Sequence, residues 1–330
     1  MSFDEVYAKL NKRTRDRLTL GSEIATEYVP TASIKLNKDL GGGFGRGRQT
    51  VIWGNKSAGK TSMLLQTIAG AQKRGEVCAW IDAENCFDKT WAQSLGVDTD
   101  KLFVNKSRSI NDVIAVCTDF LDADMDIVVL DSISALLPST YFEKEEMKEG
   151  LEGTRQIGTV SKELAVAVNK FNYANSKTAL ILISQARNKI NTYGASLDFA
   201  GGEAMKYFSS TVVKLWSSAS EKEQILGEVS RGDKLIKTPT GRPVHYTVQY
   251  NKLGPPNQTG SYDFYYKGES IGIDQIGEIV DLAEEAGIIH KGGSWYTYGD
   301  VKVQGRIKMI EYLKENISVV EEIEQKVFNG

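Results

Sequence analysis

Residues 53–62 read WGNKSAGKTS and follow the short apolar run QTVI at 49–52. The spacing from Gly54 to Gly59-Lys60-Thr61 is that of a phosphate-binding loop, which requires a strand before it and a helix after it. The sequence predicts both, a strand over 50–53 and a helix from residue 60 to about residue 73. Backbone N–H groups of such a loop surround a phosphate, and the positive end of the helix strengthens the attraction. The stretch therefore predicts a nucleoside triphosphate site.

Several side chains of this loop have expected roles. Lys60 is expected to bridge the β- and γ-phosphates, and the Thr61 hydroxyl is expected to ligate Mg²⁺. The expected phosphate-binding residues are Gly54, Asn55, Lys56, Ser57, Ala58, Gly59, Lys60, Thr61 and Ser62. A glycine-rich turn without function is the alternative, and the combination of strand, lysine, hydroxyl and helix argues against it. We expect ATP and Mg²⁺ as cofactors.

The pattern around the loop predicts an α/β fold. Apolar, β-rich runs lie at 49–53, 77–83, 101–105, 126–132 and 178–185, and helical stretches lie at 60–73, 110–123 and 154–174. Apolar runs joined by helices are typical of a parallel sheet buried on both faces, which binds ligands at the carboxyl ends of its strands. More strongly alternating runs at 210–218, 244–252 and 261–267 predict antiparallel strands that extend this sheet.

The ends of the chain have a different character from this core of residues 31–267. Residues 3–18 predict a short, highly charged helix, followed by a polar linker to residue 30. A solvated tail and an arm that packs on another subunit are both compatible with this segment. Residues 268–330 combine an amphipathic helix, a small hairpin at 292–303 and two further helices, which predicts a compact second domain.

Composition limits the possible classes of protein. The 330 residues include 40 basic and 43 acidic side chains, a net charge of −3. Such a balance gives no whole-molecule attraction to nucleic acid, so any binding must use local basic patches. No apolar run approaches the ~20 residues of a membrane span, and the charged N-terminus lacks the apolar region of a secretory signal. Three cysteines show no metal-ligand or redox spacing. We expect a reduced, cytoplasmic protein without membrane contact.

Three polar residues follow the predicted central strands. Asp131 ends an apolar strand and is expected to hold Mg²⁺ with Thr61, although a helix-capping aspartate is the alternative. Glu84 lies just past another strand and is the expected general base that orients the attacking water; an exposed loop glutamate is the alternative. The Gln185 amide is expected to contact the γ-phosphate and report hydrolysis, unless the backbone satisfies it inside the core.

Two long segments at 139–153 and 187–202 lack a regular pattern. Each begins just past a predicted central strand, at the same edge of the sheet as the phosphate loop. Loops of this length in a compact domain are usually functional or disordered. The sequence therefore places two candidate functional loops beside the nucleotide site.

These pieces, in this order, resemble the bacterial RecA family of DNA strand-exchange proteins. The matching segments are WGNKSAGKTS, CAWIDAEN, VVLDSISALLP, LISQARNKI, GGEAMKYF and GSWYTY, and they span about residues 30–330. The resemblance implies a RecA-type P-loop ATPase core with a mostly parallel sheet, a short N-terminal helix and a small α+β C-terminal domain. It implies an ATP-dependent recombinase that forms helical filaments on single-stranded DNA and pairs it with homologous double-stranded DNA.

The resemblance also implies residue roles. Asp88 and Trp91 would lie on the adenine side, the N-terminal helix would pack on the neighbouring subunit, and the C-terminal domain would recruit duplex DNA. The two long loops would line the filament axis. The expected DNA-binding residues are Met147, Lys148, Arg155, Arg187, Lys189, Gly201, Gly202, Lys206, Lys291, Lys302 and Arg306. The segment 142–152 carries five glutamates, so the second loop is the better candidate for phosphate contacts.

The chain departs from the family pattern at one catalytic position. The family carries two lysines that reach across the subunit interface to the γ-phosphate; here Lys252 matches the second and Tyr250 replaces the first. Lys252 is the expected catalytic contact. The loss of one cation predicts slower or less cooperative ATP hydrolysis, unless Arg242 or another cation substitutes. Lys56 also stands where the family has an acidic residue, which makes the phosphate loop more positive.

Two other function classes remain open from the sequence. A hexameric helicase-like motor shares this core fold, but it predicts an added domain of which the sequence shows no sign. A RecA-fold polymer that binds ATP without strand exchange would contain the same phosphate loop, base and metal ligands.

Overall fold

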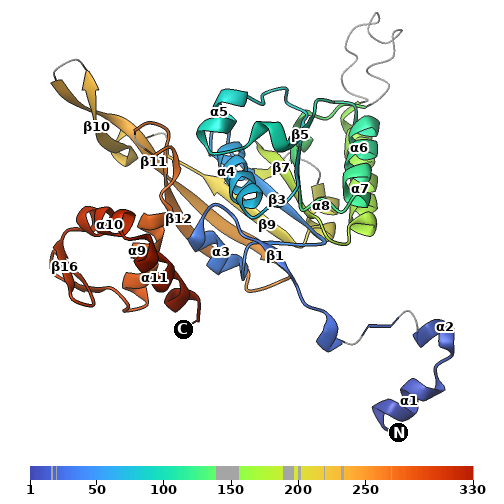
Figure 1. The fold of residues 1–330 in the computed structure, drawn as a ribbon. Coiled ribbons are helices and arrows are strands. Elements are labelled where there is room, and N and C mark those ends of the chain that lie inside the picture. Colours follow the sequence, from blue (N-terminus) through green and yellow to red (C-terminus); the bar gives the residue numbers. More distant parts are fainter. Residues whose placement is uncertain are drawn as a thin grey trace, which may run out of the picture.

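The computed structural model describes residues 1–138 apart from 16, 17 and 20, and then residues 156–188, 197–199, 202–218, 220–231, 234–268 and 270–329. Figure 1 shows an α/β core, a small C-terminal domain beside it and an N-terminal segment that reaches away from both. No helix within these described residues is both long and apolar enough to cross a membrane.

The core contains one large mixed sheet. Its strands are β3 (Arg48–Gly54), β4 (Cys78–Asp82), β5 (Leu102–Asn105), β6 (Ile127–Asp131), β7 (Ala179–Asn188), β8 (Leu197–Phe199), β9 (Thr211–Trp216), β10 (Ile225–Arg231), β11 (Lys234–Asn251), β12 (Gln258–Tyr265) and β13 (Gly272–Ile273). The main path runs β13-β12-β11-β9-β3-β7-β6-β4-β5, with β10 paired to β11 and β8 to β7. A separate two-stranded ribbon joins β1 (Tyr28–Val29) to β2 (Phe44–Gly45).

The predicted division between parallel and antiparallel strands is confirmed in part: the run at 210–218, predicted to be antiparallel, forms β9, which pairs in parallel with β3 and antiparallel with β11. β9, β3, β7, β6, β4 and β5 pair in parallel, and β11, β12 and β13 continue the sheet beyond β9, each paired antiparallel with the strand before it. β11 is longer than the run expected at 244–252, because its first half pairs with β10 in a hairpin that projects from the core (Figure 1). Strand residues that project from the core need not alternate between apolar and polar, so the sequence pattern did not predict a strand over the first half of β11.

Helices cover both faces of the sheet, as expected for buried parallel strands. These are α4 (Lys60–Lys73), α5 (Lys89–Ser94), α6 (Ile110–Asp122), α7 (Gln156–Ala174) and α8 (Gly202–Phe208). Along β3 successive side chains alternate, so that Ile52 packs into the α4 side of the core and Val51 and Trp53 pack into the α6–α7 side. Figure 1 shows these helices on opposite sides of the sheet.

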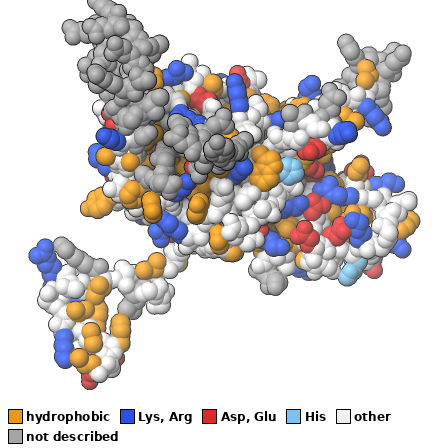
Figure 2. Space-filling view, turned by 180° about the vertical axis from the view of Figure 1, so that it is seen from behind, with side chains coloured by type: hydrophobic (Ala, Val, Ile, Leu, Met, Phe, Trp, Pro, Cys, Tyr) orange, Lys and Arg blue, Asp and Glu red, His pale blue; other side chains and the backbone are white. Residues whose placement is uncertain are grey.

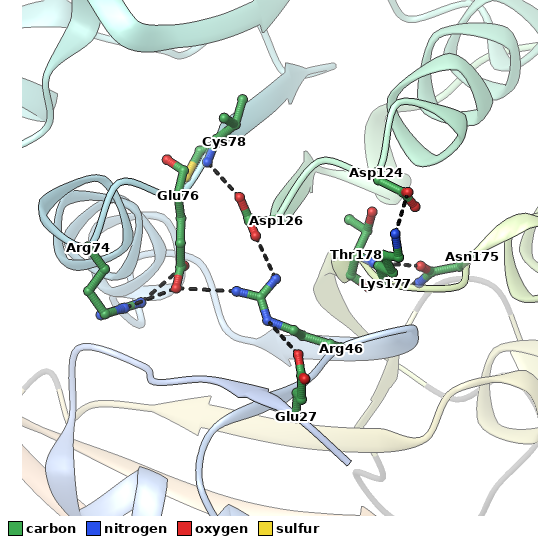
Figure 3. Close-up of polar contacts among 11 residues, drawn as sticks. Glu27, Arg46, Arg74, Glu76, Cys78, Asp124, Asp126, Asn175, Lys177 and Thr178 are labelled. Atoms are coloured by element: carbon green, nitrogen blue, oxygen red, sulfur yellow. Dashed lines mark hydrogen bonds and ion pairs between the residues drawn. The ribbon is translucent and has the colours of Figure 1, made fainter. Parts of the chain in front are cut away.

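Polar residues at the amino ends of the parallel strands form an ion-pair network (Figure 3). Arg46, just before β3, contacts Glu27 at 3.9 Å, Glu76 at 3.2 Å and Asp126 at 2.7 Å. Asp126 also accepts a 2.8 Å hydrogen bond from the Val77 backbone N–H. The network joins the starts of β3, β4 and β6 to the segment that leads from the N-terminal arm. The network lies at the amino ends of the parallel strands. Ligands in this architecture bind at the opposite edge of the sheet, where the carboxyl ends of the strands lie.

The C-terminal domain has its own small core. Its elements are α9 (Gln275–Glu285), β14 (His290–Gly292), β15 (Trp295–Tyr298), β16 (Val301–Gln304), α10 (Arg306–Glu315) and α11 (Ile317–Asn329). The hairpin expected at 292–303 is part of a three-stranded sheet, since β14 also pairs with β15. The domain contacts α3 (Ile34–Leu40) of the core through Glu278, which accepts hydrogen bonds from Ser33 Oγ at 2.6 Å and the Ile34 backbone N–H at 2.8 Å.

The N-terminal helix expected over 3–18 is two short helices, α1 (Phe3–Lys9) and α2 (Lys12–Arg15). The first ends at Leu10, whose backbone is extended, and the Asn11 side chain accepts hydrogen bonds from the Thr14 N–H and hydroxyl, capping the next turn. Ser2 and Glu5 form a reciprocal capping box at the start of α1. No residue of α1 is buried. The segment therefore owes its structure to local capping and makes no core of its own.

Candidate nucleotide site

The phosphate loop joins β3 to α4 as the sequence predicts. Gly54 ends β3 beside Leu215 of β9, and a Cβ at this position would collide with the Leu215 carbonyl oxygen. Gly59 precedes α4 with φ +86°, a left-handed conformation that glycine adopts without steric cost. The two glycines of the motif are thus required by close approach and by backbone conformation, respectively.

Lys60 lies inside the curve of the loop. Its side chain is buried, and its Nζ donates hydrogen bonds to the carbonyl oxygens of Gly54 at 3.0 Å and Asn55 at 2.8 Å. Burial lowers the pKa of the ammonium, while the Asp131 and Glu84 carboxylates oppose that shift. A desolvated cation whose hydrogen bonds within the described residues go to two carbonyl oxygens is well suited to phosphate oxygens.

The predicted metal ligands lie in contact. The Thr61 hydroxyl donates a hydrogen bond of 2.8 Å to Asp131 Oδ2 at the end of β6. Burial raises the pKa of Asp131 to about 6; the neighbouring Glu84 and Asp82 carboxylates add to the shift, and the Thr61 hydrogen bond and Lys60 oppose it. No three His, Cys, Asp or Glu side chains among the described residues could hold a metal together. Mg²⁺ usually takes one or two protein oxygens plus substrate phosphates and water, so the Thr61–Asp131 pair fits it.

Glu84 and Gln185, which the sequence treats separately, form one unit. Glu84 Oε1 accepts hydrogen bonds from Gln185 Nε2 at 2.7 Å and from Ser132 Oγ at 2.5 Å. The pairing of β4 with β6 places Asp82 opposite Asp131, and the chain beyond β4 then carries Glu84 to the end of β7, where Gln185 lies. The expected base, amide and metal ligand therefore meet at one edge of the sheet.

The structure distinguishes Asp82 from Glu84. Asp82 is buried and accepts hydrogen bonds from the backbone N–H groups of Cys86 at 3.0 Å and Phe87 at 2.9 Å, so it stabilises the turn that carries Glu84. Arg108 donates to the carbonyl oxygens of Ala83 and Glu84, each at 3.0 Å. Arg108 is a positioning residue that sequence reasoning missed, because it lies after β5 and belongs to no motif.

A cavity of about 450 Å³ opens beside the loop. Its lining residues are Gly59, Ser62, Trp91, Ser218, Gln224, Arg242, Val244, Phe264 and Tyr266. The Trp91 indole N–H donates to Ser62 Oγ at 3.2 Å, and its ring lies 6.4 Å from that of Phe264. An aromatic-lined cavity next to a phosphate loop suits a nucleoside base.

The two residues expected on the adenine side differ in position. Trp91 lines the cavity, whereas Asp88 caps α5 by accepting a 2.6 Å hydrogen bond from the Trp91 backbone N–H. Sequence reasoning did not select Phe264 and Tyr266. The aromatic run at 262–266 was the available signal, and only the pairing of β12 with β11 shows which of its rings face the cavity.

Lys252 is not brought to the phosphate loop of its own chain. Its backbone N–H donates to Ser210, whose own N–H donates to Gln49 near the start of β3, so Lys252 lies at the opposite edge of the sheet. Its Nζ donates to the Tyr207 carbonyl oxygen at 2.6 Å. Contact between Lys252 and a γ-phosphate therefore requires another copy of the chain, which is the arrangement that the family resemblance implies.

The expected DNA-binding residues are described in part. Met147, Lys148, Arg155, Lys189 and Gly201 lie outside the described residues. The other members of the second loop, Arg187, Gly202 and Lys206, lie within the described residues. Arg187, near the end of β7, is exposed and donates to the Ser134 carbonyl oxygen at 3.3 Å. Lys206 of α8 pairs with Asp198 at 3.1 Å, and Gly202 is the first residue of α8.

The three basic residues expected in the C-terminal domain all have intramolecular contacts. Lys291 pairs with Glu284 at 2.9 Å, Lys302 lies 5.3 Å from the Trp295 ring centre, and Arg306 forms two hydrogen bonds to Asp281. Lys302 lies opposite Thr297 on the face of β15 that carries the exposed Trp295, and Lys291 lies opposite the buried Tyr296; both lysines are exposed and stay candidates for DNA contact. Arg306 is half-buried against α9, and its expected contact with DNA stays a prediction.

Comparison with known proteins covers nearly the whole chain. Residues 3–272 match the model of the RecA N-terminal domain, and residues 277–329 match that of the RecA C-terminal domain. Protein RecA of Aquifex pyrophilus is 38% identical over 310 residues, which are 92% of this chain and 83% of the relative. Protein RecA of Bacteroides thetaiotaomicron is 36% identical over 312 residues, 92% of this chain and 88% of the relative. The chain therefore belongs to the RecA family, whose members are DNA-dependent ATPases that catalyse strand exchange in DNA recombination and repair.

Proposed function

We propose that this chain assembles with further copies of itself on single-stranded DNA and pairs that strand with a homologous duplex, using ATP and Mg²⁺. One observation carries the proposal: Lys60, Thr61, Asp131, Glu84 and Gln185 lie together at the carboxyl edge of the sheet. That edge also leads into the segment expected to touch DNA. Family membership supports action in the cytoplasm.

ATP binding is assigned to the loop of residues 54–62 and to the cavity beside it. Lys60 contacts the phosphates, and the aromatic rings of Trp91, Phe264 and Tyr266, which line the cavity, accommodate the base. Thr61 and Asp131 hold Mg²⁺, which supplies positive charge against the phosphate oxygens when it is bound.

Glu84 is assigned as the general base. Its carboxylate accepts hydrogen bonds from Gln185 and Ser132 through one oxygen, Oε1, and among the described residues Oε2 has no hydrogen-bond donor, so Oε2 is assigned to accept a proton from a water molecule. Hydrogen bonds to the backbone on either side, from Arg108 to Ala83 and Glu84, fix the position of this carboxylate.

Coupling to DNA is assigned to β7. Gln185 contacts Glu84, and Arg187 lies two residues further along the same strand. A shift of the Gln185 amide from Glu84 towards a γ-phosphate changes the end of β7 and the segment after it. Such ordering of a loop by γ-phosphate contacts is a known switching device. Arg187 and Lys206 then provide charge for the DNA backbone, and residues 268–330 form the domain proposed to recruit the duplex.

The testing experiment is ATP hydrolysis with and without single-stranded DNA across a salt series. We expect DNA to stimulate hydrolysis and salt to weaken the stimulation, because phosphate contacts release counterions. Glu84→Gln should abolish hydrolysis while nucleotide binding persists. Glu311→Gln, an exposed carboxylate on α10, is the matched control and should leave the rate unchanged. Hydrolysis that ignores DNA would contradict the proposal and favour an ATP-binding polymer without strand exchange.

A further inference from the structure

Arg242 of β11 lies beside the phosphate loop of its own chain. β11 pairs with β9 as far as His245 opposite Trp216, and Arg242 lies three residues beyond that pair, past the carboxyl end of β9. Side chains alternate along a strand, so Arg242 shares a face with Val244, Tyr246 and Val248. Those three are buried in the α4 side of the core, and Val244 packs next to Gly59. The guanidinium is thus directed to the side of the sheet where the phosphate loop and α4 lie.

The contacts of Arg242 confirm that placement. Its Nη2 donates a hydrogen bond to the carbonyl oxygen of Ser57 in the centre of the loop. The same side chain lines the cavity together with Gly59, Ser62 and Trp91. Arg242 therefore contacts both the phosphate loop and the cavity beside it.

The hydrogen-bonding capacity of this guanidinium is largely unused. An arginine carries five N–H donors, and the Arg242 Nε is buried without an acceptor among the residues that the structure describes. No carboxylate within the described ranges forms an ion pair with it. A half-buried cation that contacts a single carbonyl is poorly compensated, and oxygen atoms with negative charge would satisfy it.

The register of β11 separates this residue from the positions that face another subunit. Tyr250 lies eight residues further along the strand, roughly 27 Å at ~3.4 Å per residue. It is half exposed, and Lys252 follows it towards the opposite edge of the sheet. β11 thus carries Arg242 beside the nucleotide site of its own chain. It also carries Tyr250 at the position where the family has a lysine that contacts the nucleotide of the neighbouring subunit.

We propose that Arg242 is a phosphate-binding residue of the ATP site, provided by the same chain that provides the loop, and that its charge offsets the loss of the lysine that Tyr250 replaces. The proposal rests on the assignment of ATP to this site. A planar guanidinium forms two parallel hydrogen bonds to phosphate oxygens, which a lysine ammonium does not reproduce. Bound phosphate takes the place of the Ser57 carbonyl as the acceptor for Nη2.

Equilibrium binding without DNA tests the phosphate contact. We would titrate ATP, ADP and adenosine into the full chain and into Arg242→Gln, following the total tryptophan fluorescence, to which Trp91 of the cavity contributes, and checking by calorimetry. Arg242→Gln should weaken ATP and ADP by about 10- to 100-fold and leave adenosine unchanged, as expected for charged hydrogen bonds to phosphate. The ATP and ADP affinities of Arg242→Lys should lie between those of the original chain and those of Arg242→Gln. Lys237→Gln, an exposed cation on the same strand, is the control and should change none of the three affinities.

Two results would overturn the phosphate contact. Equal weakening of all three ligands would show that Arg242 only supports the loop through Ser57. An unchanged ATP affinity in both Arg242 variants would show that Arg242 does not contact the bound nucleotide. If the unaltered chain bound none of the ligands, the proposed function itself would fail, which is a different outcome. Circular dichroism melting of each variant establishes that it is folded.

A second measurement tests the compensation for Tyr250. DNA-dependent turnover is compared in the original chain, Tyr250→Lys, Arg242→Gln and the double variant. If Arg242 supplies the missing charge, Tyr250→Lys should raise turnover several-fold more in the Arg242→Gln background than in the original chain. Equal gains in the two backgrounds would show that the two positions act independently, and the compensation would be wrong.

Discussion

At the scale of single residues, the site is defined by hydrogen bonds to Glu84. Gln185 and Ser132 both donate to Oε1, and Arg108 holds the backbone of the same residue. This arrangement gives the expected base one fixed orientation. It also means that Gln185, proposed to detect the γ-phosphate, and Glu84, proposed to activate water, are in direct contact, so a change at either should affect the other.

Gln185→Ala should uncouple hydrolysis from DNA. The change removes the amide that joins Glu84 to the strand leading to Arg187, so stimulation by single-stranded DNA should fall to about 1-fold. ATP affinity should change by less than about 2-fold, because the phosphate loop is intact. The ratio of rates with and without DNA measures the effect. Gln93→Ala, an exposed amide on α5, serves as control, and persistent full stimulation in Gln185→Ala would refute the assigned role.

Tyr250→Lys should increase DNA-dependent turnover by about 2- to 5-fold, because a cation across the subunit interface stabilises transition-state charge and Arg242 already supplies part of that charge. The increase should require assembled protein and disappear under conditions that dissociate it. Steady-state hydrolysis as a function of protein concentration shows both effects. Tyr173→Lys adds a lysine at an exposed position of α7 and controls for charge alone. An unchanged or lower rate would mean that Tyr250 does not face a nucleotide.

At the scale of elements, the contact between α9 and α3 includes one buried carboxyl group. Glu278 is 2% exposed and accepts hydrogen bonds from Ser33 and Ile34 at the start of α3. Burial raises the pKa of Glu278 to about 7, and those hydrogen bonds and Lys35 oppose the shift. The joint between the C-terminal domain and the core therefore contains a group that titrates near neutral pH.

Because the pKa of Glu278 is raised from 4.5 to about 7, the folded chain retains a proton that the unfolded chain has released. The free energy of unfolding should therefore fall as pH rises from about 4.5 to about 7, by an amount on the order of 3 kcal/mol. Glu278→Gln cannot release a proton, so its stability should depend less on pH in this window.

Urea unfolding at several pH values between 4.5 and 8 measures this dependence. Glu285→Gln, an exposed carboxyl on the same helix, should retain the slope of the original chain. Parallel pH profiles for Glu278→Gln and the original chain would contradict the assignment. A lower absolute stability of Glu278→Gln at every pH would not, because the amide accepts only one of the two hydrogen bonds.

At the scale of the whole molecule, the N-terminal arm exposes apolar side chains that the rest of the described chain does not cover. Phe3, Val6 and Tyr7 of α1 are 67%, 47% and 39% exposed, and no residue of that helix is buried. Figure 1 shows α1 and α2 apart from the core, and Figure 2 shows hydrophobic side chains on the surface of this segment at the lower left. Such a stripe gains stability only against another surface, which favours the subunit-packing arm over the solvated tail.

Changing both Phe3 and Tyr7 to Ser should reduce self-assembly. The stacked rings, 6.2 Å apart, form the largest apolar surface of α1, and their loss should shift sedimentation towards the monomer at a given protein concentration. Nucleotide binding by the monomer should persist, since the arm lies far from the phosphate loop in Figure 1. Asp4→Ser, on the same helix, is the control. Assembly that is unaffected by the double change would leave the arm a solvated tail.

The sequence by itself determined the parts of this protein that depend on neighbouring residues. The phosphate loop and the start of α4 follow from Gly54, Gly59 and Lys60, whose conformations are set within a few residues. The parallel strands follow from apolar runs, and the polar residues Asp131 and Glu84 could be placed at one edge because parallel strands end together. The charged hairpin half of β11 and the break between α1 and α2 escaped detection, because neither carries a periodic apolar signal.

The tertiary structure alone decided which distant residues meet. Gln185 forms a hydrogen bond with Glu84, which lies 101 positions away in the sequence, and Arg242 forms one with Ser57, which lies 185 positions away. The register of β11 places Arg242 at the phosphate loop and Lys252 at the other edge, and that of β12 places Phe264 in the cavity. Register is set by pairing between strands far apart in sequence, and a slip of one residue would turn each side chain to the opposite face. Local sequence fixes what each residue can do, and strand pairing fixes which partner it has.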